Sequence, residues 1–127
     1  MSATRSADTR RVLMVDDEPS LLEGFRIAFS RADRPVETSD SFEGARKKLI
    51  EERFDILITD VRLGPFNGLQ LAIIARDRYP EIGIIVISGY DDPVLQAEAA
   101  QIGARYLVKP VGFEQLLEVI DALKPTP

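Results

Sequence analysis

The chain has 127 residues, 45% of them hydrophobic, which is enough for one domain built around a single core. Its formal net charge of −5 argues against a general nucleic-acid binder, because such proteins neutralise phosphates with basic residues. The sequence contains no cysteine and no histidine, which excludes disulfide scaffolds, thiol catalysis, zinc held by Cys or His, Ser-His-Asp hydrolysis and a phosphohistidine carrier.

Residues 1–9 are small and polar without periodicity, so we expect a disordered N-terminal tail. No apolar run approaches the ~20 residues needed to cross a bilayer, and the polar start does not resemble a signal peptide. These features, with the lack of cysteine, predict a cytoplasmic protein with no membrane partner.

Short apolar runs alternate with helical patterns along the first half of the chain. Residues 12–15 predict a buried strand, and the apolar spacing that follows predicts a helix from about Ser20 to Ala32. Residues 35–39 are a weak strand candidate, and Asp40 or Ser41 can cap a second helix. The run Phe54–Asp60 is rich in β-branched residues and predicts a strand buried on both faces.

The second half continues the alternation after a stretch of turn formers at 61–68. A helix is predicted next, with an inner face of Leu69, Ala72, Ile73 and Tyr79 and an end at Pro80. The remaining predicted elements are a strand at 84–87, a helix capped by Asp91 or Asp92 and ended by Gly103, a strand at 106–108 and a helix at 113–123.

Five strand–helix units in succession predict an α/β fold. Buried strands alternating with amphipathic helices indicate a parallel sheet covered on both faces. Right-handed crossovers leave few topologies, and we expect a flavodoxin-like, doubly wound (βα)5 fold with strand order 2-1-3-4-5.

Polar residues follow four of these strands at the carboxyl edge of the predicted sheet. They are Asp16 and Asp17, Asp60, Ser88 and Lys109. Each alone is explained as a helix cap, a turn residue or a surface charge. Because parallel strands end at one edge, we expect these side chains to gather into one site.

Clustered carboxylates repel one another and need a proton or a cation. Oxygen ligands without His or Cys suit a hard ion, and Mg²⁺ is the natural candidate. The carboxylate of Asp60 is also a competent nucleophile towards a phosphoryl group. The ammonium of Lys109 and the hydroxyl of Ser88 would stabilise the charge that develops in such a transfer.

The chain resembles the receiver domains of two-component response regulators over Val12 to Leu123. The resemblance rests on Val15-Asp16-Asp17-Glu18-Pro19, Thr59-Asp60-Val61-Arg62-Leu63 with Asn67-Gly68, Ser88-Gly89, and Gly103-Ala104-Arg105-Tyr106-Leu107-Val108-Lys109-Pro110. We assign residues 10–124 to this domain and residues 125–127 to a tail or the start of a linker.

The resemblance implies that Asp60 is the phosphoacceptor, phosphorylated by a sensor histidine kinase or a histidine phosphotransfer protein. It also implies that Asp17, Asp60 and the backbone carbonyl of Arg62 bind Mg²⁺ directly, while Asp16 acts through a bound water. Lys109 would pair with the phosphoryl group, and its bond to Pro110 is expected to be cis.

The family also implies a conformational switch. Ser88 would hydrogen-bond the phosphoryl oxygens, and Tyr106 would turn inward when Ser88 moves; a plain core tyrosine is the alternative reading of Tyr106. The helix after Asp92, the strand at 106–108 and the helix at 113–123 would carry the change to a partner. That partner would be an output protein, an output domain on a longer chain, or a second copy in a homodimer, and the domain itself would not bind nucleic acid.

Two positions depart from the usual receiver pattern. Gly64 stands where receivers commonly have proline, with Pro65 after it, and we expect this to alter the loop without touching the charged groups. Ser88 replaces the commoner threonine and keeps the hydroxyl. Arg62 and Tyr90 occupy positions that, in the receiver family, influence the lifetime of the phosphoryl group, and we hypothesise that their bulk screens the attacking water. Faster dephosphorylation of wild type than of an Arg62→Ala, Tyr90→Ala double variant would contradict this.

Two other functions remain open. A pseudo-receiver would bind proteins without phosphorylation. A phosphatase of the haloacid dehalogenase type needs a second acid two residues after the nucleophile, where this chain has Arg62. A flavin-binding protein of the flavodoxin type is also disfavoured, because the carboxylates of residues 16–18 would repel the phosphate of the flavin. We therefore expect no enzyme activity beyond autocatalytic phosphotransfer and autodephosphorylation.

Overall fold

The structure is a computed structural model that describes residues 9–123. The expectations for residues 1–8 and 124–127 lie outside this range. In chain order the elements are β1 (Val12–Val15), α1 (Pro19–Arg31), β2 (Glu37–Ser39), α2 (Phe42–Glu51), β3 (Ile56–Asp60), β4 (Arg62–Leu63), β5 (Phe66–Asn67), α3 (Gly68–Arg78), β6 (Gly83–Ser88), α4 (Pro93–Gln101), β7 (Arg105–Val108) and α5 (Phe113–Ala122).

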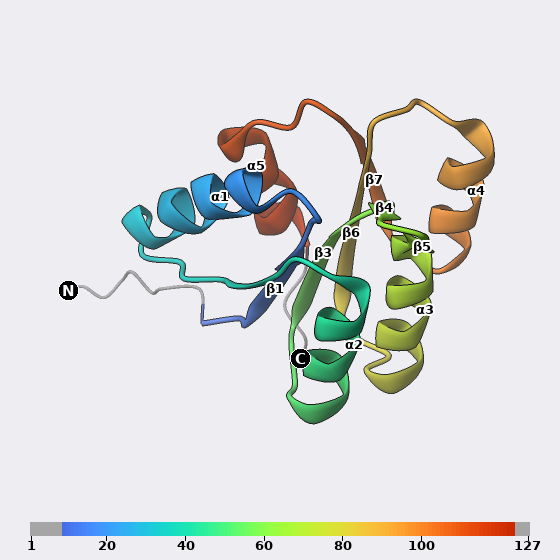
Figure 1. The fold of residues 1–127 in the computed structure, drawn as a ribbon, viewed down its shortest axis with the longest axis horizontal. Helices are drawn as coiled ribbons and strands as arrows, with labels where there is room; N and C mark the ends of the chain where they lie inside the picture. The colour runs from blue at the N-terminus through green and yellow to red at the C-terminus, as the bar shows by residue number, and fades with distance from the viewer. Residues whose placement is uncertain (1–8, 124–127) are drawn as a thin grey trace.

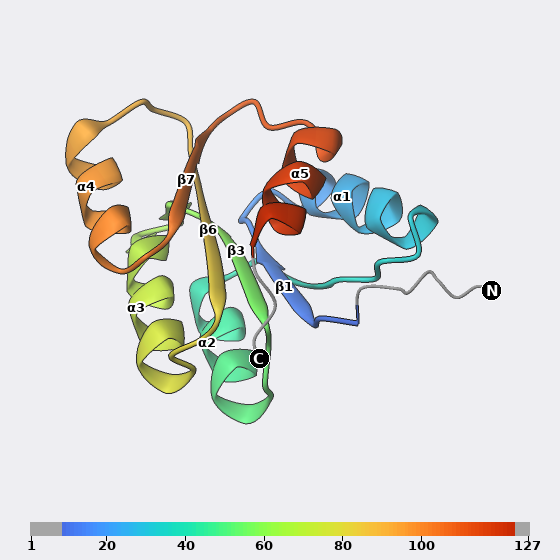
Figure 2. The ribbon, with the colours of Figure 1, turned by 180° about the vertical axis from the view of Figure 1, so that it is seen from behind.

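Five strands form one parallel sheet in the order β2-β1-β3-β6-β7. Counted among these five strands, the order is 2-1-3-4-5, so the predicted fold is confirmed. Helices α1 and α5 cover one face of the sheet, and α2, α3 and α4 cover the other (Figures 1 and 2). The connections that follow β6 and β7 cross the same edge of the sheet, beside the short β4–β5 hairpin (Figure 1).

Both faces of the central strands are buried, as the apolar run before Asp60 predicts. Leu57 belongs to the core cluster beneath α2 and α3, whereas Ile56 and Ile58 pack on the α1 and α5 side. This alternation is the two-residue period of a strand. Each buried Leu or Ile side chain contributes roughly 1.5–3 kcal/mol, and a slip by one residue would exchange the two faces. The register of β3, and with it the position of Asp60, is therefore strongly fixed.

The predicted inner face of α3 is wrong at one position. Ile73 is 54% exposed, whereas Leu71 and Ala75 are buried together with Leu69 and Ala72. Residues 71–75 are all apolar, so periodicity alone does not define one face of this helix. The contacts of α3 with α2, β3 and β6 decide which side is buried.

The stretch of turn formers after Asp60 is a small antiparallel hairpin rather than an irregular loop. Arg62 pairs with Asn67 and Leu63 pairs with Phe66, leaving Gly64-Pro65 as the two-residue turn. Gly64 has φ +60°, which is the first central position of a type II′ turn. Strands of two residues are too short to give an alternating sequence pattern, so the sequence predicts only a loop.

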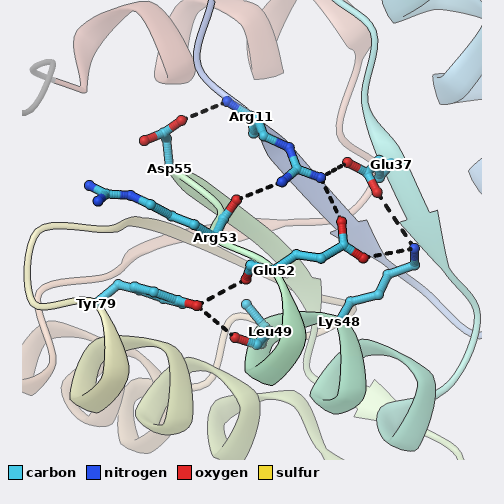
Figure 3. Close-up of polar contacts among 8 residues, drawn as sticks. All are labelled: Arg11, Glu37, Lys48, Leu49, Glu52, Arg53, Asp55 and Tyr79. Carbon is cyan, nitrogen blue, oxygen red and sulfur yellow. Dashed lines mark hydrogen bonds and ion pairs between the residues drawn. The ribbon is translucent and has the colours of Figure 1, made fainter.

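A network of charged groups lies at the opposite edge of the sheet, just before β1 (Figure 3). The guanidinium of Arg11 donates to Oε1 of Glu52 (2.7 Å), to the Arg53 carbonyl (3.0 Å) and to Glu37. Lys48 lies 3.5 Å from Glu37 and 4.0 Å from Glu52. These side chains are partly exposed to solvent, so each pair contributes little alone. Together they connect β1, β2 and α2 at the end of the domain remote from Asp60.

Within residues 9–123, the helices are all too short or too polar to cross a membrane.

Replacing Tyr79 by Phe should lower the free energy of unfolding by about 1–2 kcal/mol. Its hydroxyl donates to the carbonyl oxygens of Leu49 (3.0 Å) and Glu52 (2.9 Å), at the end of α2 where helix carbonyls lack intrahelical partners (Figure 3). Urea unfolding measures the effect. Tyr90→Phe is the matched control, because Tyr90 is 64% exposed and its change should stay within about 0.5 kcal/mol. Equal stability of the two variants would contradict this account.

Candidate functional site

Three carboxylates meet at the carboxyl edge of the sheet. Asp16 and Asp17 directly follow β1, and Asp60 is the last residue of the neighbouring strand β3. One oxygen from each of the three lies within 4.8 Å of the others. Asp16 (3% exposed) and Asp60 (6% exposed) are buried, while Asp17 is exposed. The parallel sheet therefore brings together the acidic residues that the sequence predicts to be neighbours.

Lys109 places an ammonium group among these carboxylates. Its Nζ lies 3.0 Å from Oδ2 of Asp60 and 3.4 Å from Oδ2 of Asp16. Lys109 follows β7, and its amide donates to the Ser88 carbonyl (2.8 Å), which connects the ends of β6 and β7. The Lys109-Pro110 bond is cis, as the resemblance to receiver domains implies.

The charges shift the ionisation of this group of residues. Burial raises the pKa of Asp16, and the nearby charge of Asp60 raises it further, while the hydrogen bond from the Glu18 amide and the charge of Lys109 oppose both effects. Partial burial would lower the pKa of Lys109, but its hydrogen bond to Asp60 and the charges of both carboxylates raise it overall. Lys109 therefore stays protonated, and its one ammonium contacts two of the three carboxyl groups.

This donor set fits a hard divalent cation. The three side chains offer carboxylate oxygens alone, which suit Mg²⁺ or Ca²⁺ better than a softer transition metal. The fourth predicted contributor, Arg62, begins β4 two residues after Asp60, and its amide lies 3.3 Å from Oδ1 of Asp60. The backbone of Arg62 is thus next to the acidic cluster, and its guanidinium lies 5.9 Å from the centre of the Tyr90 ring.

A cavity of about 550 Å³ opens beside Asp60 and holds the predicted hydroxyl and ammonium. Asp60, Ser88, Tyr90 and Lys109 are among its lining residues. Ser88 ends β6 and is 2% exposed, and its Oγ accepts a hydrogen bond from the Tyr90 amide (3.1 Å). A group bound to Asp60 in this cavity would have a hydroxyl and an ammonium on its walls.

Tyr106 lies on β7 and is half-buried against the core cluster on the α3 and α4 side. Its hydroxyl donates to the Tyr90 carbonyl (2.7 Å). Because the amide of the same Tyr90 residue is bound to Ser88, a short chain of hydrogen bonds connects Ser88 with Tyr106 through Tyr90. The two predicted switch residues are therefore in indirect contact.

Two further residues position the Asp60 backbone and are not predicted as site residues. The buried hydroxyl of Thr59 donates to the Asp60 carbonyl (2.9 Å). A Cβ on Gly68 would lie 1.9 Å from the same oxygen, so this position accepts only glycine. The available signal is the Asn67-Gly68 pair before a helical pattern, since Asn67 caps α3 by accepting from the Leu69 amide (2.8 Å).

The expectation that Gly64-Pro65 leaves the charged groups untouched is wrong. The Gly64 amide donates to Oδ2 of Asp17 (3.0 Å). This hydrogen bond joins the β4–β5 hairpin to the connection between β1 and α1. The positive φ of Gly64 lets the chain form a tight turn here, which the sequence pattern alone does not define.

Comparison with known proteins gives a consistent family. The model of the response regulator receiver domain matches residues 12–121. The chain is 31% identical over 112 residues to the response regulator protein PilR of Pseudomonas aeruginosa, covering 87% of this chain and 25% of that protein. It spans about a quarter of the length of the first curated relatives that it matches.

Two solved structures have the same fold. A CheY-like receiver domain from Methanospirillum hungatei has a TM-score of 0.84 and 26% identity, with 90% of this chain and 92% of that chain covered. A response regulator from Burkholderia pseudomallei, solved with a phosphorylated aspartic acid, a calcium ion and citrate, has a TM-score of 0.80 and 27% identity. That match covers 91% of this chain and 66% of the other.

The family match spans nearly the whole described chain, and the strand order and the acidic edge agree with it. The chain belongs to the family of response regulator receiver domains.

Proposed function

We propose that this domain is a cytoplasmic phosphorylation switch in which Asp60 accepts a phosphoryl group. The donor would be the phosphohistidine of a sensor histidine kinase or of a histidine phosphotransfer protein. The observation that carries this proposal is the position of the Asp60 carboxylate, 3.0 Å from the Lys109 ammonium and within reach of two other carboxylates. The Burkholderia relative with a phosphorylated aspartic acid and a calcium ion supports the same chemistry.

In the transfer, an Asp60 carboxylate oxygen forms a bond to phosphorus as the bond between phosphorus and the donor imidazole nitrogen breaks. Lys109, protonated throughout, donates to a phosphoryl oxygen and compensates charge in the transition state. The Ser88 hydroxyl would donate to another oxygen. Since the phosphoryl group is transferred to Asp60 of the domain itself, no separate binding site for an acceptor substrate is needed.

Mg²⁺ bound at this edge would supply positive charge to the phosphoryl oxygens and reduce the repulsion among the carboxylates. We assign its direct ligands to Asp17, Asp60 and the backbone carbonyl of Arg62, with Asp16 acting through a water molecule. The grouping of the three carboxylates and the absence of His and Cys from the chain support an oxygen-only site.

The switch would follow from the hydrogen bonds that begin at Ser88. A phosphoryl group brings a charge of about −1.5 to −2 and favours the arrangement in which Ser88 donates to it. A shift of Ser88 would weaken its contact with the Tyr90 amide, and Tyr90 in turn holds the Tyr106 hydroxyl. Arg62 and Tyr90, which both line the cavity, would limit the approach of the hydrolytic water.

The surface of α4, β7 and α5 would present the change to a partner. Tyr90, Val94 and Val108 are exposed large side chains on or next to these elements. PilR is about four times as long as the part that matches, which is consistent with an output domain attached to such receivers. A separate output protein and a homodimer through this surface are the other arrangements that we propose to test.

Incubation with a small phosphoryl donor such as acetyl phosphate and Mg²⁺ should add one phosphoryl group to the protein. Intact-mass spectrometry should find the group in wild type and in Asp77→Asn, a matched change of an exposed aspartate on α3, and not in Asp60→Asn. Chelation of Mg²⁺ should suppress the reaction. Equal labelling of Asp60→Asn and wild type, or no labelling by either acetyl phosphate or any of a panel of phosphorylated kinases, would favour a pseudo-receiver.

Asp16→Asn should raise the stability of the metal-free domain at pH 7 by roughly 1 kcal/mol, or about 4 °C in Tm. Burial holds the pKa of Asp16 above its ordinary value of 3.8, so folding favours the protonated acid. The stabilisation from this group is complete below its unfolded-state pKa and is lost as the pH rises through the raised folded-state pKa.

The gain from Asp16→Asn should therefore be larger at pH 7 than at pH 4, where wild-type Asp16 is increasingly protonated. Asparagine keeps an oxygen for the Glu18 amide, which Asp16 accepts at 2.9 Å. Thermal unfolding at both pH values, with and without Mg²⁺, measures the difference, and Mg²⁺ should stabilise wild type more than the variant. A variant less stable than wild type at pH 7 without metal would contradict the assigned repulsion.

A further inference from the structure

We propose that the β4–β5 hairpin is a backbone template that holds Asp17 in position for the cation, and that Gly64 is its positioning residue. This inference rests on the proposed Mg²⁺ site and goes beyond it, because it assigns the orientation of a ligand to a turn that departs from the usual receiver sequence.

Two amides of the hairpin contact two different carboxylates. The Arg62 amide lies 3.3 Å from Oδ1 of Asp60, and the Gly64 amide lies 3.0 Å from Oδ2 of Asp17. The two carboxylates lie at the ends of neighbouring strands, since Asp60 is the last residue of β3 and Asp17 comes after β1. One short segment of backbone therefore spans the cluster from one strand end to the next.

The hairpin is itself held firmly against the domain. The Leu63 side chain is 2% exposed in the core beneath α2 and α3, and the Phe66 ring is stacked on Phe42 of α2 at 4.7 Å. The Gly68 amide donates to the Val61 carbonyl (2.6 Å) and closes the base of the hairpin. A backbone amide on such a support is a fixed donor.

The contact with Asp17 needs the order Gly64-Pro65. A proline at position 64 would have no N–H to donate, and its ring would fix φ near −65° instead of the observed +60°. Glycine adopts the positive φ without strain, and Pro65 then occupies the second central position of the turn. The departure from the common pattern thus adds a donor that faces the acidic cluster.

A fixed donor matters because Asp17 is the exposed member of the cluster. An exposed aspartate samples several rotamers, and ordering it on binding costs free energy. A charge-assisted hydrogen bond to one carboxylate oxygen limits that motion and leaves the other oxygen for a cation. The hairpin would in this way increase Mg²⁺ affinity by preorganisation rather than by supplying a new ligand from Gly64.

Magnesium titration of three proteins tests the proposal, followed by ¹H–¹⁵N NMR with MgCl₂ alone. Gly64→Pro should raise the Mg²⁺ Kd about tenfold, which corresponds to about 1.4 kcal/mol. Pro65→Ala is the matched control, because it leaves the Gly64 N–H and its positive φ in place, and its Kd should stay within about twofold of wild type. A Gly64→Pro Kd equal to or lower than that of wild type would overturn the proposal.

A second measurement does not depend on the folding of Gly64→Pro. In metal-free wild type the Gly64 amide should exchange with solvent more slowly than its intrinsic rate, and Asp17→Ala should increase that exchange about tenfold or more. An unprotected Gly64 amide in wild type, or exchange unchanged in Asp17→Ala, would also overturn it. Failure of the Mg²⁺ site itself has a different signature, namely wild type that does not bind Mg²⁺ saturably although its Gly64 amide is protected.

Discussion

The pair of contacts from Lys109 to Asp60 and Asp16 is the interaction on which the site depends. Two buried carboxylates on neighbouring strands repel each other, and the ammonium between them is the main compensating charge among the described residues. The three residues lie at the carboxyl ends of β7, β3 and β1, so the arrangement exists only when the sheet is fully formed. Compensation is incomplete because Asp17 adds a third carboxylate. We propose that this remaining negative charge is met by a cation, and that the site with its cation accepts a phosphoryl group.

The two edges of the sheet differ in how their charges are arranged. At the amino edge, Arg11 and Lys48 face Glu37 and Glu52 in a network of opposite charges (Figure 3). At the carboxyl edge, like charges are grouped instead, and burial raises the pKa of Asp16. The first arrangement connects neighbouring elements, whereas the second lowers local stability, a cost that the proposed cation would offset. Functional sites commonly show this opposition between local stability and activity.

The carboxyl-edge site could be predicted from sequence because its geometry follows from topology. Once the apolar runs before Asp16, Asp60 and Lys109 are identified as parallel strands, their ends must meet. The exposure of Ile73 could not be predicted, because residues 71–75 are all apolar and this part of α3 has no polar face. Tertiary contacts determine which of its sides is buried. The donor role of Gly64 was also inaccessible, because it is a property of backbone direction in a two-residue turn. Sequence patterns are patterns of side-chain types, whereas every residue except proline carries a backbone N–H, so the sequence does not indicate which amide acts as a donor.

The central claim is that a phosphoryl group on Asp60 shifts Ser88, Tyr90 and Tyr106 together. The most direct measurement is an NMR comparison of the Mg²⁺-bound domain with and without beryllofluoride, a stable mimic of the phosphoryl group. The account predicts large amide shifts at Ser88 and Tyr90 and a changed ring environment for Tyr106, all absent in Asp60→Asn. Shifts confined to the neighbours of Asp60, with Tyr106 unchanged, would contradict the switch, and an unchanged spectrum would contradict phosphorylation at this site.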